Sequence, residues 1–397
     1  MLPLEGFTVI DLSRALAGPY CTTMLADFGA NVIKVESCTG GDPSRNWPPF
    51  DSDGRSLYYD SVNRNKRSMS IDFYSEEGRE KLELLITHAD VLVENFKFGT
   101  LEAMGFGPAK LSELNPGLLH VSINAYGQSG PLHNLPGLDQ VIQAASGLTS
   151  VTGPSGGSGY RVGLPIVDIV SGMNAAYGVV TALLGKTRGV ATEKVSTSLF
   201  ESALALSVFQ GQQAISLGEA PVAQGNSHPS IAPYGAFETE TDSLVVAVST
   251  DKHWLAFAEI LQRVEWVQDE RFATSAARTT NRDALDRAIT EALSAKPAEK
   301  WIAAFRAAGI PSGPINDYKQ AFESEQAQAL GITQVARRSD GSSIPLVRNP
   351  LSMDGQPTMV RMAAPDLGEH TDEILHEMGI VRNMLVAAGR KETDKQR

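Results

Sequence analysis

The first third of the chain alternates short apolar segments with helical patterns, and this alternation restricts the fold more than any other feature of the sequence. Helical periodicity follows Pro19 and runs again from Ser75 to His88. Segments of strand length lie around these helices: Phe7–Leu12, Asn31–Glu36, Ser68–Phe73, Asp90–Phe96 and Leu118–Ala125. Parallel strands need a crossover connection, usually a helix, so this pattern predicts a doubly wound, mostly parallel sheet of the α/β class.

The segments that follow the predicted strands mark where a ligand is expected, because such sheets bind ligands beyond the carboxyl ends of their strands. These segments are Ser13–Gly18, Glu36–Asp42, Glu94–Phe96 and Ala125–Gly130. The first of them lacks the glycine pattern of a dinucleotide-binding turn. The sequence therefore predicts a ligand site at this edge of the sheet that is not a nicotinamide or flavin dinucleotide site.

The length of 397 residues suggests more than one domain. A hairpin is predicted around Thr241–Ser243, and helical patterns follow from Lys252 to Leu261 and from Arg282 to Ala308. We expect a Rossmann-like large domain and a smaller α+β domain. Their expected bounds are 1–200 with 325–397 for the large domain, 226–317 for the small domain, and 201–225 with 318–324 for the linkers. Two further helices are predicted at 199–215 and 371–378.

Composition excludes several classes of partner. The formal net charge of −12 argues against nucleic acid or an anionic membrane surface as the main partner. No apolar run is expected to be long enough for a membrane span. The two cysteines, Cys21 and Cys38, fit a reducing compartment, so we expect a cytoplasmic protein. The seven histidines are scattered without the spacing of metal ligands, and no metal site is expected.

Asp168 stands at the predicted start of an apolar helix. The segment Arg161–Asp168 precedes apolar residues that recur at helical spacing from Ile169 to Leu184. Aspartate is a favoured helix N-cap because its oxygen accepts an orphan backbone N–H. The same position also suits a nucleophilic carboxylate, since a helix N-terminus stabilises an anion. This segment by itself leaves both interpretations open.

The order of motifs along nearly the whole chain resembles one known family. The motifs are Val9–Pro19, Leu25–Glu36, Gly41–Arg45, Asn65–Ser68, Val93–Phe96, Gly127–Pro131, Arg161–Asp168, Ala232–Phe237, Asn349–Leu351 and Pro365–Thr371. Together they resemble the class III coenzyme A transferases, the group that contains the formyl-CoA and carnitine CoA-transferases. The resemblance is specific because many separate motifs occur in the same order.

The resemblance implies both an architecture and a chemistry. The family is an interlocked homodimer of two ring-like chains, with a large Rossmann-like domain built from both ends of the chain. Its nucleophile is an aspartate at the position of Asp168. An acyl-CoA and a carboxylic acid are the substrates, and the CoA thioester takes the place of a permanently bound cofactor. The reaction passes through an aspartyl-CoA thioester.

The resemblance also assigns binding residues. Leu16 and Ala17 match positions at the thioester, and Arg67 and Lys97 are candidates for the phosphates of CoA. The positions that match the CoA groove are Asp72, Phe73, Asn95, Phe96 and Met104. The chain departs from the formyl-CoA enzyme at Leu16, where that enzyme has glutamine, and at Ser37 and Ala103, where it has phosphate-binding arginines. Its phosphate contacts therefore stay open.

The acids are expected to be small dicarboxylates. The segment Asn226–Tyr234 resembles that of family members that use succinyl-CoA with C5 acids such as mesaconate, itaconate or citramalate. A second carboxylate needs a cation or several hydrogen-bond donors. Arg45 and His228 are the candidates for this contact, with Arg14 as a further one.

Two alternative functions are compatible with the same fold. The first is an acyl-CoA racemase, which uses a histidine and an aspartate to move an α-proton. The histidine of its Gly-His-Asp pattern falls on Leu138, which cannot carry a proton. The second is a catalytically silent CoA-binding protein, which the missing phosphate arginines favour and the presence of Asp168 opposes.

Overall fold

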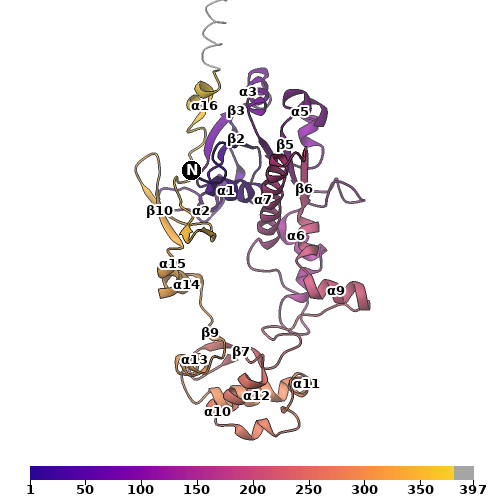
Figure 1. Ribbon diagram of the computed structural model, residues 1–397, viewed down its shortest axis with the longest axis vertical. Coiled ribbons are helices and arrows are strands. Elements are labelled where there is room, and N and C mark those ends of the chain that lie inside the picture. The colour runs from indigo at the N-terminus through magenta and orange to yellow at the C-terminus, as the bar shows by residue number, and fades with distance from the viewer. Residues whose placement is uncertain (380–397) are drawn as a thin grey trace, which may run out of the picture. The chain divides into compact units, whose positions relative to one another are not determined.

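The structure is a computed structural model in which residues 1–379 are described, and the chain divides into two compact units (Figure 1). Unit 1 consists of Met1–Ser146, Val162–Gly211 and Ala327–Arg397, and its residues 380–397 lie outside the described residues. Unit 2 consists of Gly147–Arg161 and Gln212–Gln326. Unit 2 therefore includes the segment 226–317 of the expected small domain, and also residues 147–161, which the expected bounds place in the large domain.

Unit 1 is built on a parallel sheet of six strands, as the alternating pattern predicts. The strands are β1 (Thr8–Asp11), β2 (Asn31–Ser37), β3 (Arg67–Ile71), β4 (Val91–Glu94), β5 (Leu119–Asn124) and β6 (Lys194–Ser198). Their order is β3-β2-β1-β4-β5-β6, and every neighbouring pair is parallel. The order reverses between β1 and β4, so their carboxyl ends form the topological switch point where such sheets bind ligands.

Helices cover both faces of this sheet. In order, the helices of unit 1 are α1 (Ala17–Asp27), η1 (Pro43–Asn46), α2 (Leu57–Ser61), α3 (Glu76–Thr87), α4 (Thr100–Ala103), α5 (Pro108–Leu114), α6 (Asp139–Ala145), α7 (Ile166–Thr187), α8 (Leu199–Ala205) and α16 (Thr371–Glu377). Ile10 and Ile33 pack with Leu82 and Leu85 of α3 in one buried cluster. Side chains alternate across a strand, so Asp11 points to the other face, where its carboxylate meets Thr22 of α1.

Helix α7 is longer than the sequence pattern predicts and is apolar enough, by length and composition alone, to cross a membrane. The expectation that no apolar run has this length is therefore wrong. The core helix of a globular unit passes the same test, and α7 packs against α1, α8, β5 and β6. Its buried face carries small residues, among them Gly172, Ala175 and Ala176. This composition lets α7 approach α1 closely.

The remaining elements of unit 1 come from the C-terminal part of the chain. They are the antiparallel pair β10 (Thr333–Arg337) and β11 (Ser343–Val347) and the short pair β12 (Ser352–Met353) and β13 (Gln356–Pro357). Two helices continue across the division between the units, α9 (Val208–Leu217) and α15 (Glu325–Leu330). The predicted helix at 199–215 is two helices, α8 and α9, because the backbone turns at Val208, whose φ is +39°.

Unit 2 is an α+β unit. Its sheet has the order β7-β8-β9, with β7 (Tyr234–Glu238), β8 (Ser243–Ala247) and β9 (Ser312–Pro314), and both pairs are antiparallel. The predicted hairpin is β7–β8. The helices are η2 (Leu148–Val151), α10 (Asp251–Ile260), η3 (Val264–Val267), α11 (Ser275–Thr280), α12 (Arg282–Leu293), α13 (Ala298–Ala307) and α14 (Tyr318–Glu323). The helical pattern from Arg282 to Ala308 is interrupted before Pro297, because proline has no N–H to continue a helix. Aromatic side chains such as Trp254, Phe257 and Phe305 fill its core.

Candidate functional site

The loop after β1 is held rigidly at the switch point. The Arg14 N–H donates to Asn95 Oδ1 and Asn95 Nδ2 donates back to the Arg14 carbonyl, both at 2.8 Å. The next residue, Ala15, has a φ of +64°, a conformation that costs free energy in a non-glycine residue. Its N–H donates to both carboxylate oxygens of Asp42 at 3.1 Å. Contacts from the ends of β2 and β4 therefore fix this loop.

Two buried ion pairs lie beneath the loop. Lys34 Nζ is 2.9 Å from Asp42 Oδ2 and also donates to the Ser13 carbonyl at 2.9 Å. Lys66 Nζ is 3.1 Å from Asp11 Oδ2, and all four charged side chains are fully buried. Burial raises the pKa of Asp42, but the charge and hydrogen bond of Lys34 outweigh this effect and lower it to about 2. Removing one partner of such a pair leaves an unpaired buried charge and costs about 3–5 kcal/mol.

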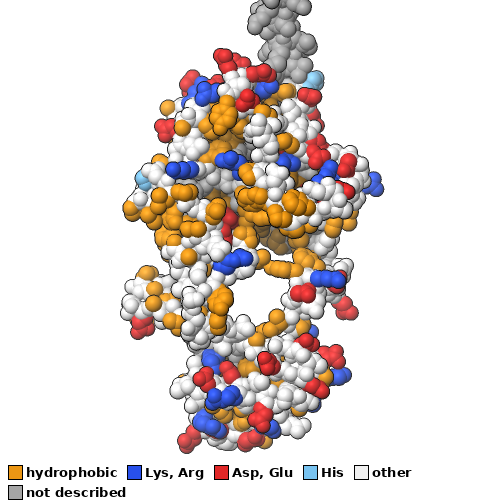
Figure 2. Space-filling view, turned by 180° about the vertical axis from the view of Figure 1, so that it is seen from behind, with side chains coloured by type: hydrophobic (Ala, Val, Ile, Leu, Met, Phe, Trp, Pro, Cys, Tyr) orange, Lys and Arg blue, Asp and Glu red, His pale blue; other side chains and the backbone are white. Residues whose placement is uncertain are grey.

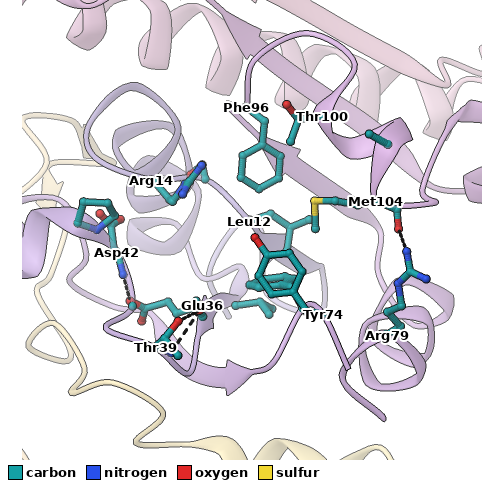
Figure 3. A pocket seen from close by; sticks show the side chains of 17 residues that line it. Leu12, Arg14, Glu36, Thr39, Asp42, Tyr74, Arg79, Phe96, Thr100 and Met104 are labelled. Carbon is teal, nitrogen blue, oxygen red and sulfur yellow. Dashed lines mark hydrogen bonds between the residues drawn. The ribbon is translucent and has the colours of Figure 1, made fainter. Parts of the chain in front are cut away.

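A pocket of about 700 Å³ opens at the carboxyl ends of β1, β2 and β4 (Figure 3). Its apolar lining comes from Leu12, Phe73, Tyr74, Phe96 and Met104. Figure 3 shows the rings of Tyr74 and Phe96 pointing into the same space on either side of Leu12 and Met104. The volume and the mixture of aromatic and polar groups are typical of a site for a small molecule.

The charges of the pocket favour an anion. Both acids that line the pocket are paired with cations that do not line it. Glu36 accepts hydrogen bonds from Arg45 at 2.7 and 2.8 Å, and Asp42 is paired with Lys34. The Arg14 guanidinium lies over the Phe96 ring, 5.2 Å from its centroid, and has no carboxylate partner within the described residues. Arg79 reaches in from α3 and donates to the Met104 carbonyl at 2.8 Å. Two arginines therefore supply the uncompensated positive charge.

Asp168 lies in the first turn of α7 and is not its N-cap. The N-cap residue is Pro165, which has no side chain able to bond the helix amides. Asp168 is half-buried, and its pKa is raised to about 7, first by burial and then by the carboxylate of Asp139. The capping interpretation of Asp168 is therefore wrong. A carboxylate without a cationic partner and with a pKa near neutrality is characteristic of a functional site.

Close packing places Asp168 beside the loop after β1. Gly172 lies one helical turn after Asp168 on the same face of α7. A Cβ at Gly172 would be 2.5 Å from the Ala17 carbonyl oxygen, so only glycine allows the two backbones to meet here. Burial, together with the charges of Asp168, Asp42 and Asp139, raises the pKa of Tyr58 to about 12, which places this tyrosine of α2 near these carboxylates. Asp42 lines the pocket, so Tyr58 lies near one acid of the pocket as well as near Asp168.

The structure brings some of the candidate residues together. Phe73, Phe96 and Met104 line the pocket, whereas Asp72, Asn95 and Lys97 lie beside it and do not line it. Asn95 holds the loop after β1, as described above. Leu16 and Ala17 are buried where α1 begins, next to α7.

Other candidate residues have different partners. Arg67 begins β3, at the end of the strand opposite the pocket, and pairs with Glu373 and Glu377 of α16. Arg45 is bound by Glu36, by the Pro365 carbonyl and by the Tyr59 ring, so its charge is already compensated. His228 belongs to unit 2, where its ring stacks on Tyr234 at 5.0 Å between centroids.

Several site residues were not found from the sequence. Arg79 and Tyr74 line the pocket, while Tyr58 and Asp139 approach Asp168. A partial signal exists for Tyr74, which follows a predicted strand end. Asp139 stands at the aspartate of the Gly-His-Asp pattern whose histidine falls on Leu138, and no local pattern marks Arg79 or Tyr58. Among residues 1–379, no group of three or more His, Cys, Asp or Glu side chains is arranged to hold a metal ion.

Comparisons with known proteins agree on one family. Residues 4–371 match the family described as CoA-transferase family III. The chain is 36% identical to a succinate–glutarate CoA-transferase of Agrobacterium fabrum, covering 95% of this chain and 96% of that protein. It is 34% identical to an acetyl-CoA:oxalate CoA-transferase of Acetobacter aceti, covering 92% and 93%. A crystal structure of a CaiB/BaiF family protein from Brucella suis superposes with a TM-score of 0.85 at 33% identity, covering 95% of this chain and 99% of that one.

Proposed function

Since the chain belongs to CoA-transferase family III and is an enzyme of the CoA-transferase type, we propose that it moves CoA between carboxylic acids through a covalent intermediate on Asp168. The observation that carries this proposal is the state of Asp168 itself. It is a half-buried carboxylate with a pKa of about 7, no cationic partner among the causes of that shift, and a fixed loop beside it. Such a carboxylate is a stronger nucleophile than one stabilised by an ion pair.

The proposed chemistry needs only acyl exchange between oxygen and sulfur. The ionised carboxylate of Asp168 attacks the thioester carbonyl, the carbon–sulfur bond breaks, and CoA leaves as a thiolate from a mixed anhydride. The thiolate then attacks the aspartyl carbonyl, which releases the first acid and forms an aspartyl-CoA thioester. A second acid attacks this thioester, and the same two steps run in reverse to give the new acyl-CoA.

We assign the pocket at the carboxyl ends of β1, β2 and β4 to the CoA moiety. Phe73, Tyr74 and Phe96 offer aromatic faces for the adenine ring, and Met104 adds a polarisable contact. Arg14 and Arg79 supply positive charge for the phosphates, in place of the arginines that the chain lacks at Ser37 and Ala103. Leu16 and Ala17 would lie along the thioester. CoA enters and leaves as a substrate in this scheme, not as a permanently bound cofactor.

We propose succinyl-CoA as the donor and a small C5 dicarboxylate, of the glutarate, mesaconate, itaconate or citramalate type, as the acceptor. The support is the similarity to a protein named a succinate–glutarate CoA-transferase. The relative named for oxalate also acts on a dicarboxylate, so a diacid is common to both names. Chain length is therefore the property that a panel of acids has to resolve.

His228 is the proposed contact for the second carboxylate, since the charge of Arg45 is already compensated. His228 Nδ1 accepts the Ser230 N–H at 3.2 Å, which leaves Nε2–H as the donor. A charge-assisted contact of this kind contributes about 1.5–3 kcal/mol, or roughly a ten- to hundred-fold preference.

The test of this assignment is kcat/KM for succinyl-CoA against butyryl-CoA with one common acceptor, followed by oxalate, glutarate and mesaconate as acceptors. We expect a preference of at least about tenfold for succinyl-CoA, and His228→Ala should reduce it. Equal values for the two donors in the unaltered enzyme would refute the diacid assignment and leave only the transferase. Failure of every acid to accept CoA would refute the proposed function itself.

A homodimer is the proposed assembly, with the exposed side of α7 in its interface. Met173, Tyr177, Val180 and Leu184 recur at helical spacing on that side, and each is exposed in the single chain. Hydrophobic side chains also gather in patches on the surface of unit 1 in Figure 2. A contiguous exposed apolar surface of this kind is typical of a protein–protein interface. Light scattering should give twice the chain mass, and Tyr177→Glu should reduce it to that of one chain. A monodisperse monomer of the unaltered protein would contradict the proposal.

A further inference from the structure

The first turn of α7 is capped by a carboxylate from another helix. No side chain at the N-cap bonds the helix amides. Instead, Asp139 at the start of α6 accepts the N–H of Val167 at 2.8 Å and the N–H of Asp168 at 3.2 Å, both with Oδ2. Two of the free amides of α7, including that of Asp168, are therefore satisfied by Asp139.

Asp139 is itself held in place on its other side. Gln143 Nε2 donates to Asp139 Oδ1 at 2.5 Å, and Gln143 is fully buried. The carbonyl oxygen of the same amide accepts the Val162 N–H at 2.8 Å, so Gln143 also fixes the segment that leads into α7. The carboxylate of Asp139 consequently has one orientation, with one oxygen toward Gln143 and the other toward Asp168.

We propose that Asp139 is a positioning residue for the transfer reaction, which fixes the first turn of α7 and places a second negative charge beside the nucleophilic carboxylate. The proposal rests on the proposed function of Asp168. It assigns to Asp139 a task beyond capping, because a neutral side chain could cap the helix equally well. A negative charge next to the nucleophile repels it, and this repulsion ends when the nucleophile loses its own charge on acylation.

The groups around Asp168 show how this charge acts. Burial and the Asp139 carboxylate both raise the pKa of Asp168, and no cation contributes to the shift. Tyr58 of α2 faces both acids, and its pKa of about 12 keeps it protonated. Asp42, the other acid whose charge acts on Tyr58, is paired with Lys34. No cation therefore contributes to offset the repulsion between Asp168 and Asp139.

This repulsion favours the covalent intermediates. When the Asp168 carboxylate becomes an anhydride or a thioester, it loses its negative charge, and its repulsion with Asp139 ends. The free enzyme is thereby raised in free energy relative to the acylated enzyme, which is a form of ground-state destabilisation with a specific geometric cause. A more basic carboxylate is also the better nucleophile once it is ionised.

The substitution Asp139→Asn separates charge from capping, because the amide oxygen can still accept the two N–H groups. Asp139→Glu is the charge-retaining control, and Gln143→Met is the control that loosens the clamp without removing the charge. The first measurement is the pH profile of kcat/KM for succinyl-CoA. The acid limb of the unaltered enzyme should lie near the pKa of about 7, and Asp139→Asn should move it down by on the order of one pH unit. Both controls should lower the rate without moving the limb.

The second measurement does not depend on turnover. Selective carbon-13 labelling of aspartate, with the Asp168 signal assigned by its loss in Asp168→Asn, follows the titration of Asp168 directly. The signal should titrate at lower pH in Asp139→Asn than in the unaltered protein. An unmoved titration in folded Asp139→Asn would overturn the proposal, whatever the activity. If the titration of Asp168 moves in Asp139→Asn but the unaltered protein has no transferase activity, the result would support the positioning role of Asp139 and refute the proposed function instead.

Discussion

The close contact between α7 and the start of α1 gives a sharp test of how Asp168 is positioned. In Gly172→Ala the new Cβ would be 2.5 Å from the Ala17 carbonyl oxygen, where ordinary contacts begin at 3.4 Å. The two backbones must therefore separate by about 0.9 Å. Overpacking of this kind costs about 1–3 kcal/mol, and the higher helix propensity of alanine recovers up to about 1 kcal/mol of it. If alanine recovers the full ~1 kcal/mol, a net loss of about 0–2 kcal/mol in unfolding free energy is expected.

The effect on activity should exceed the effect on stability. Asp168 lies one turn from Gly172 on the same helix face, so a separation of the backbones moves its carboxylate away from Leu16 and Ala17. A misplacement of about 1 Å can reduce the rate on the order of a hundredfold. Urea unfolding and kcat/KM for succinyl-CoA measure the two effects.

Gly185→Ala is the matched control for this test. It lies in the same helix, and its Cβ would meet the Val190 carbonyl oxygen at an ordinary 3.4 Å. This variant should keep the activity of the unaltered enzyme, and its unfolding free energy should be unchanged or higher by up to about 1 kcal/mol. Normal activity in Gly172→Ala, or an equal loss in both variants, would refute the argument that this contact positions the nucleophile.

Three further results are expected. Arg79→Gln should raise the KM for succinyl-CoA about tenfold with little change in kcat, and a normal KM would remove Arg79 from the phosphate site. The pKa of about 2 for Asp42 lies below the ordinary 3.8, so its pairing stabilises the fold above about pH 4 and loses this effect as the pH falls toward 2. Urea midpoints should show a loss of about 2.5 kcal/mol across that window, and Lys34→Met should be strongly destabilised at neutral pH while losing less on acidification. Leu138 cannot move a proton, so a chiral 2-methylacyl-CoA in D₂O should gain no α-deuterium, and enzyme-dependent exchange would favour a racemase.

The regular elements of the first third could be predicted because each has a strong local signal. Asn31–Glu36 contains Val32, Ile33 and Val35 and is β2 within one residue, and Ser75 caps α3 as its position suggests. β6 was missed because Lys194–Ser198 has a single large apolar residue and lies at the edge of the sheet, where half of its side chains face solvent. Tertiary packing pairs it with β5, and no local pattern records that pairing.

Some residues of the candidate site could likewise be predicted from the sequence, and others could not. Phe73 and Phe96 could be placed because they follow strands whose carboxyl ends meet at the switch point. Arg67 was a candidate through the family resemblance alone; it begins β3, so it lies at the end of the strands opposite the pocket. Asp139 and Tyr58 are brought to Asp168 by helices that are distant in the sequence, and their role depends on packing that periodicity does not encode.

The covalent intermediate on Asp168 tests the central claim most directly. The enzyme is incubated with succinyl-CoA alone, treated with hydroxylamine or borohydride, digested, and analysed by mass spectrometry. The account predicts that the peptide containing Asp168 carries a hydroxamate or a reduced side chain, that omission of succinyl-CoA removes the product, and that Asp168→Ala neither forms it nor transfers CoA. A turning-over enzyme with an unmodified Asp168, or substantial turnover by Asp168→Ala, would contradict the account.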